Sequence, residues 1–95
     1  MKTPLSLTSA IILLAIANGR GYGFEIMDAT GLPSGTIYPA LRRLEKARLI
    51  RSDWESTAAA ESNGPPRKYF RVTGEGKSAL EAAEKRFPAV AQLKG

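Results

Sequence analysis

With 95 residues, the chain has room for one domain with a modest core and is too short for two ordinary domains. Hydrophobic residues make up 43% of it and charged residues 24%, a balance typical of a folded, soluble domain. Fourteen lysines and arginines against nine acidic residues give a formal net charge of +5. That charge favours polyanions as partners, nucleic acid first and an anionic membrane second.

The composition also excludes most kinds of chemistry. The chain has no cysteine and no histidine, so disulfides, thiolate nucleophiles, imidazole bases and the usual zinc sites are ruled out. Its carboxylates form no recognisable catalytic constellation, and no glycine-rich phosphate loop follows a strand. We therefore expect a protein that is not an enzyme and that needs no metal and no cofactor.

An apolar run at residues 10–17 contains the triplet Ala15-Ile16-Ala17, which imitates the cleavage site of a secretory signal. The run is shorter than the about 20 apolar residues that span a bilayer. We expect instead a buried first helix over residues 8–18, with Ser6 or Thr8 as its N-cap. This helix is apolar around most of its circumference, so it must be covered on more than one side. The domain core covers one side, and a second subunit is one option for the other.

Two further helices follow, separated by a tight turn. Glycines flank a second helix over residues 22–30, and Gly31-Leu32-Pro33 predicts the turn. The third helix is expected over residues 34–46, with Ser34 as its N-cap. Apolar side chains spaced four and three residues apart form its inward face, and polar or basic side chains occupy the others. The inward set is Ile37, Leu41 and Leu44, and the other faces carry Thr36, Pro39, Arg42, Arg43 and Lys46.

After the third helix the apolar period changes from about 3.6 to 2, which indicates strands. Residues 49–55 and 67–72 are the two predicted strands. The connector between them is rich in turn residues, with Asn63-Gly64 at the bend. The pair is therefore predicted to be an antiparallel hairpin with a long loop.

A final helix is expected after Thr73, which can serve as its N-cap. Its apolar residues repeat at the spacing of a helix-packing seam, and Pro88 bends or ends the helix. The seam either closes back on the first helix of the same chain or forms a two-fold dimer. We prefer the dimer, because both helices are more apolar than a monomer of this size can cover. The seam residues are Leu80, Ala83, Phe87 and Val90.

This order of elements predicts a fold that is mainly α with a small antiparallel hairpin, a winged helix-turn-helix of the type α-α-α-β-β-α. Residues 1–73 would form the DNA-binding domain and residues 74–95 a C-terminal dimerisation helix, within one structural unit. Arg42 and Arg43 could then reach guanine edges or phosphates from the third helix, and the basic residues of the wing could reach phosphates or the minor groove.

Simpler interpretations stay open for the same residues. Arg42 could pair with Glu45, and Lys46 with Asp53, as ordinary solvated charges. Arg67 and Lys68 could be no more than charges that protect an edge strand from aggregation. Tyr38 flanks the inward face and could belong either to the core or to a phosphate contact. The aromatic residues expected in the core or along a dimer cleft are Tyr22, Phe24, Trp54 and Phe70.

Two segments carry a family resemblance. "GYGFEIMDATGLPSGTIYPALRRLEKARLI" and "GPPRKYFRVTGEGKSAL" resemble the PadR family of bacterial transcriptional regulators, and the similarity covers roughly residues 5–80. The resemblance implies a homodimeric repressor in the cytoplasm that binds double-stranded DNA at an inverted-repeat operator and is released by a small-molecule effector or another signal. By position, the implied DNA-binding residues are Ser34, Thr36, Tyr38, Arg42, Arg43, Arg67 and Lys68.

One residue departs from the family pattern, because Arg48 stands where similar proteins usually have a glycine. Fold does not fix function, so a winged-helix module that binds another protein and no DNA is the alternative. Peripheral membrane attachment through the first helix ranks last, and no membrane partner is expected.

Overall fold

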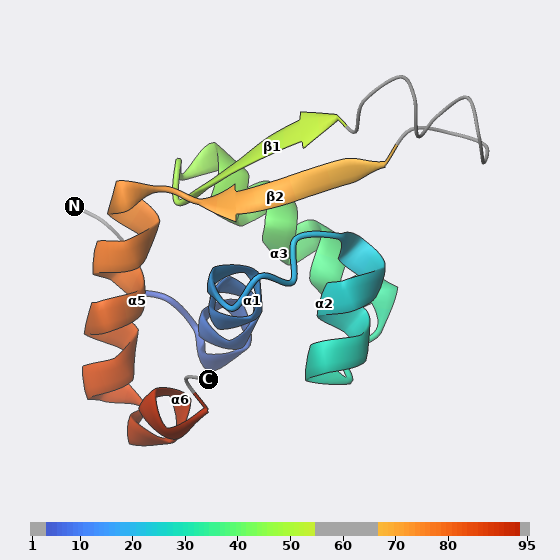
Figure 1. Ribbon diagram of the computed structural model, residues 1–95. Coiled ribbons are helices and arrows are strands. Elements are labelled where there is room, and N and C mark those ends of the chain that lie inside the picture. Colours follow the sequence, from blue (N-terminus) through green and yellow to red (C-terminus); the bar gives the residue numbers. More distant parts are fainter. Residues whose placement is uncertain (1–3, 55–66, 94–95) are drawn as a thin grey trace.

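The computed structural model describes residues 4–54 and 67–93 of the chain (Figure 1). It has the predicted winged-helix architecture, with one additional short helix at the end. The elements in chain order are α1 (Leu7–Ala17), α2 (Gly23–Thr30), α3 (Ser34–Lys46), β1 (Ile50–Trp54), β2 (Lys68–Val72), α5 (Gly74–Arg86) and α6 (Pro88–Gln92).

Helix α1 is the centre of the molecule. It lies between α5 on one side and α2 and α3 on the other, with the hairpin above it in the view of Figure 1. Ala10, Ile12 and Leu13 are fully buried, as a helix that is apolar around its girth requires. The Ser6 hydroxyl accepts a hydrogen bond from the N–H of Ser9 at 3.1 Å, so Ser6 is the N-cap and the helix begins one residue earlier than predicted.

Helix α2 is closed at both ends by local hydrogen bonds. Tyr22 is its N-cap residue, and the N–H of Tyr22 donates to the Glu25 carboxylate at 3.2 Å. At the other end, Gly31 has φ 74°, and its N–H donates to the carbonyl of Met27 at 2.8 Å. A left-handed residue is the common end of a helix, and glycine adopts it without a steric cost.

The prediction that Ser34 is the N-cap of α3 is wrong, because Pro33 holds that position. The carbonyl of Pro33 accepts the N–H groups of Thr36 and Ile37 at 3.0 and 3.1 Å. The backbone of Pro33 is extended, with φ −74° and ψ 158°, which is the non-helical geometry of an N-cap, and Ser34 is the first helical residue. The helix continues through Pro39 and buries one apolar face, formed by Ile37, Ala40, Leu41 and Leu44.

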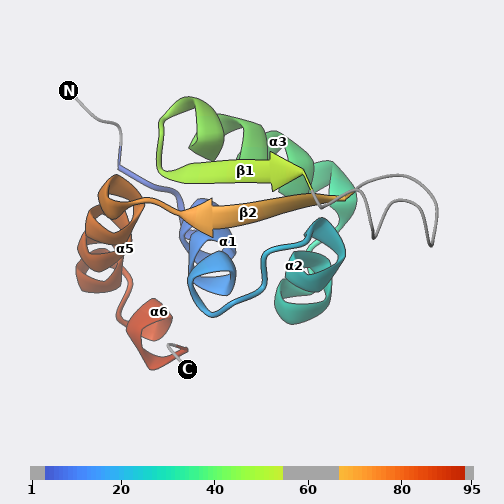
Figure 2. The same ribbon diagram turned by 45° about the horizontal axis from the view of Figure 1, so that its top comes forward.

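The two strands form the predicted antiparallel hairpin, with a register that runs from Ile50 opposite Val72 to Trp54 opposite Lys68. Strand β1 lies on the α3 side and β2 on the side of α1 and α2 (Figure 2). At one end of the hairpin, Ile50 belongs to the core and Val72 packs against it, whereas Trp54 at the other end is exposed. The predicted bend at Asn63-Gly64 lies outside the described residues.

Strand β2 also bonds to the connection between α1 and α2. The N–H of Phe70 donates to the carbonyl of Gly21 at 2.8 Å, and Tyr22 forms a β-bridge with Tyr69. The Tyr69 ring covers Gly21 so closely that a Cβ at that position would lie 2.3 Å from it. The wing is therefore held at a fixed place against the start of α2.

The chain turns from α3 into β1 through a residue with a positive φ. Arg48 has φ 64°, where glycine is favoured, which explains why similar proteins usually have glycine at this position. The Arg48 carbonyl accepts a hydrogen bond from the Thr73 hydroxyl at 2.8 Å. The backbone thus keeps the left-handed turn even though the residue is arginine.

The C-terminal seam closes on its own chain. Leu80, Ala83 and Val90 belong to the buried core, and Phe87 packs against that core. Helices α5 and α6 both contact α1, so the seam packs on the first helix of its own chain, which was the alternative to a dimer. They cover the part of the apolar surface of α1 that α2 and α3 leave uncovered. Pro88 ends the predicted helix, which is divided into α5 and α6.

Candidate nucleic-acid interface

Helix α3 presents two arginines on the face opposite its buried stripe. Arg42 and Arg43 are both exposed, whereas their neighbours Leu41 and Leu44 are 2% exposed. Within residues 4–54 and 67–93, neither arginine has a hydrogen bond or an ion pair. Their guanidinium groups are available to an acceptor from outside the chain.

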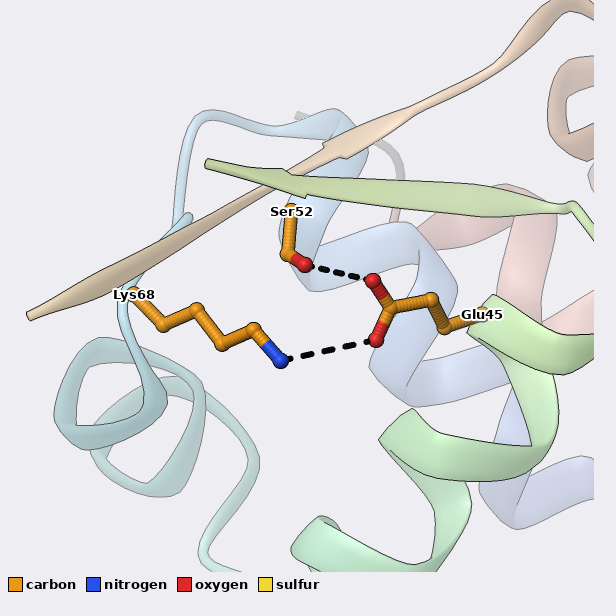
Figure 3. A network of polar contacts seen from close by, with 3 residues as sticks. All are labelled: Glu45, Ser52 and Lys68. Carbon is orange, nitrogen blue, oxygen red and sulfur yellow. Dashed lines mark hydrogen bonds and ion pairs between the residues drawn. The ribbon is translucent and has the colours of Figure 1, made fainter. Parts of the chain in front are cut away.

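The pairings proposed as simpler interpretations are not the ones that form. Glu45 accepts a hydrogen bond from the Ser52 hydroxyl, and Lys68 Nζ lies 3.7 Å from its carboxylate (Figure 3). Asp53 pairs with Arg71, with 3.9 Å between Asp53 Oδ2 and Arg71 Nε. Glu45 therefore connects the third helix to both strands of the wing instead of neutralising an arginine of its own helix.

Tyr38 lies on the surface and packs over the start of α2. Its side chain is 45% exposed. A Cβ built on Gly23 would lie 2.4 Å from the Tyr38 hydroxyl, so the close approach of α3 to α2 here depends on glycine. The phenol is thus placed beside the first turn of α2 and stays partly exposed to solvent.

A hollow of about 480 Å³ lies between α2, α3 and β2, and we call it the wing hollow. It brings together four of the seven residues that the family resemblance implies for DNA binding: Tyr38, Arg42, Arg67 and Lys68. Ser34, Thr36 and Arg43 lie on α3 away from its walls. The remaining lining residues are Tyr22, Gly23, Phe24, Leu41, Glu45 and Phe70.

Two exposed aromatic rings support the cations of the wing. The guanidinium carbon of Arg67 lies 5.3 Å from the centroid of the Phe24 ring, and Lys68 Nζ lies 5.7 Å from that of Trp54. Phe24 is 51% and Trp54 67% exposed, which excludes the core for these two and leaves the dimer cleft as the other predicted place, whereas Phe70 is buried. Sequence reasoning found these rings and these cations but not the pairing between them.

Other kinds of site find no support in the part of the chain that is described. No group of three or more acidic side chains there could hold a metal ion. None of the helices in residues 4–54 and 67–93 has both the length and the apolar character needed to cross a membrane.

A helix-turn-helix whose last helix exposes arginines, flanked by a two-stranded wing with further cations, defines a winged-helix DNA-binding protein. The family model "Transcriptional regulator PadR-like family" matches residues 12–82. The chain belongs to the PadR-like family, in agreement with the resemblance of its two segments. It is a DNA-binding transcriptional regulator of a non-enzymatic family.

Solved structures of PadR family regulators agree with this assignment. A PadR family transcription regulator from hypervirulent Clostridium difficile is 29% identical, with 93% of this chain and 94% of that chain covered and a TM-score of 0.75. A PadR-like transcriptional regulator from Bacillus cereus is 28% identical, with 90% and 84% covered and a TM-score of 0.69. A protein of Lysinibacillus sphaericus is 30% identical over 92 residues, which cover 88% of this chain and 81% of the relative.

Proposed function

We propose that the protein is a homodimeric repressor that binds an inverted-repeat operator, with α3 in the major groove and the wing on the adjacent backbone. The observation that carries this proposal is the common face of Tyr38, Arg42, Arg67 and Lys68 around the wing hollow, while the apolar face of α3 is buried. A regulator with this partner works in the cytoplasm, where the chromosome lies.

The proposed contacts divide by their place on the face. Arg42 and Arg43 reach base edges, where an arginine binds guanine with two hydrogen bonds, or the flanking phosphates. Ser34 and Thr36 lie in the first turn of α3, and the N-terminus of a helix favours a phosphate. Tyr38, together with the wing cations, contacts the backbone.

Most of the predicted seam is buried within one chain, so the dimer needs further apolar surface. A groove of about 780 Å³ lies between α5, the segment before α1 and the connection from α3 to β1, and it is lined by Leu5, Leu49, Ala79 and Ala82 among others. We place the contact between subunits there, because an exposed apolar groove on a small chain is stabilised by a second copy. We also propose, from the family resemblance, that a small-molecule effector or another signal releases the DNA.

Selection of bound fragments from random duplex DNA tests the proposal. The expected result is an enriched palindrome whose half-sites are centred about 10 base pairs apart or at multiples of that spacing, because dimer symmetry is mirrored in the operator. Sedimentation of the free protein should show two copies. Enrichment of a motif without two-fold symmetry would contradict the dimeric operator complex, and indifference to DNA with one co-purified protein would favour a protein-interaction module.

A further inference from the structure

The start of α2 holds the first cation of the wing through a series of stacked rings. The Phe24 ring stacks on Tyr22, with centroids 5.5 Å apart and planes inclined by 11°. The Tyr22 ring meets Tyr69 of β2 edge to face at 4.9 Å. Arg67, the residue directly before β2, lies over the Phe24 ring. The rings therefore fix Phe24 relative to the strand that carries the arginine.

The two neighbouring wing cations are held in different ways. Lys68 also lies over a ring, that of Trp54, but its ammonium group is 3.7 Å from the Glu45 carboxylate, whose negative charge offsets its own. Arg67 lies over the face of a ring, which attracts the cation through its quadrupole and carries no formal charge. Stacking uses the face of the guanidinium and not its edge, so the N–H donors, which have no hydrogen bond or ion pair among the described residues, can serve an anionic acceptor.

The place of Arg67 decides which acceptor it can serve. It lines the wing hollow together with Tyr38 and Arg42, which come from the recognition helix. A phenol hydroxyl and two guanidinium groups around one open hollow are a donor set suited to a phosphodiester. A strand of DNA that runs from α3 to the wing would pass this hollow.

We propose that Phe24 is a positioning residue for DNA binding, which holds Arg67 over the wing hollow so that it can bind a phosphate of the DNA backbone. The inference rests on the proposed function. It assigns the neighbouring cation another task, because Lys68 ties the wing to α3 through Glu45 and contributes less to the binding of phosphate.

The test compares wild type, Phe24→Leu, Arg67→Ala and the double variant on a labelled duplex of about 30 base pairs and mixed sequence at low salt. A mixed sequence is sufficient, because phosphate contacts are independent of sequence. Phe24→Leu should weaken binding about two- to five-fold, and Arg67→Ala at least as much. Both should lower the log–log salt slope by about 0.9, the value for one phosphate contact. The double variant should bind like Arg67→Ala alone.

Two controls separate positioning from general damage. Phe24→Tyr keeps a ring under the guanidinium and should restore the wild-type affinity and salt slope. Lys77→Ala removes a charge from the exposed side of α5 and should leave the slope unchanged. Because Phe24 is half-exposed, the thermal midpoint of Phe24→Leu should stay close to that of wild type.

An equal loss from Phe24→Leu in the presence and absence of Arg67, or no loss at all, would overturn the inference while leaving DNA binding intact. If the wild-type protein itself showed no salt-dependent binding to duplex DNA, the proposed function would fail first. The two failures are thus distinguished by the wild-type curve.

Discussion

Helices α1 and α3 are similar in length, but α1 packs inside the domain whereas α3 exposes one polar face to solvent. Helix α1 contacts α2, α3, α5, α6 and β2, and most of its apolar side chains are buried in this chain's own core. Helix α3 buries one stripe and leaves two arginines without a partner among the described residues. Charges that do not stabilise the fold point to an outside partner, whereas a helix with most of its side chains buried has little surface left to offer one.

The largest expected effect comes from the covered helix. Leu13 is fully buried in α1, so Leu13→Ala should lower the free energy of unfolding by about 2–5 kcal/mol. Arg43→Ala on the exposed face of α3 is the matched control and should change it by less than about 0.5 kcal/mol. Urea unfolding at one fixed protein concentration measures both, because dimerisation adds to apparent stability. A loss below about 1 kcal/mol for Leu13→Ala would contradict the packing of α1.

The contrast between the two helices was visible in the sequence because periodicity reports burial directly. The apolar girth of α1 and the single stripe of α3 both follow from the spacing of side chains along a helix. The N-cap of α3 was missed, since serine is a strong local signal and the extended Pro33 before it took the position. Local preference and local geometry compete there, and only the fold decides between them.

Partners that lie far apart along the chain were beyond the reach of such patterns. Nothing in the spacing of Leu80, Ala83, Phe87 and Val90 tells whether an apolar seam is covered by its own chain or by a second copy. The candidate site shows the same limit. Its arginines were predicted from their place on α3, whereas the contact of Phe24 with Arg67 exists only because β2 is bonded to the start of α2.

The second prediction concerns the exposed helix and leaves stability unchanged. Arg42→Ala or Arg43→Ala should weaken binding to the selected operator by roughly 1–3 kcal/mol where a two-bond contact with guanine is lost. The loss should be smaller on a mixed-sequence duplex, because a base contact contributes only to the specific complex. Titration of labelled duplexes measures both. Equal losses on the two duplexes would assign the arginine to a phosphate instead of a base.

The smallest effect is expected where α3 ends, and it has the opposite sign. Arg48 has φ 64°, so Arg48→Gly should raise the free energy of unfolding by about 0.5–1 kcal/mol, the relief of the left-handed strain less the greater flexibility of glycine in the unfolded chain. Arg48→Ala removes the same charge but keeps the Cβ, so it should give no such gain in thermal or urea unfolding. If alanine stabilised as much as glycine, the gain would come from the charge of the basic face and not from the backbone. Repulsion among the exposed cations of α3 and of the residues that follow it would then limit the stability of this region.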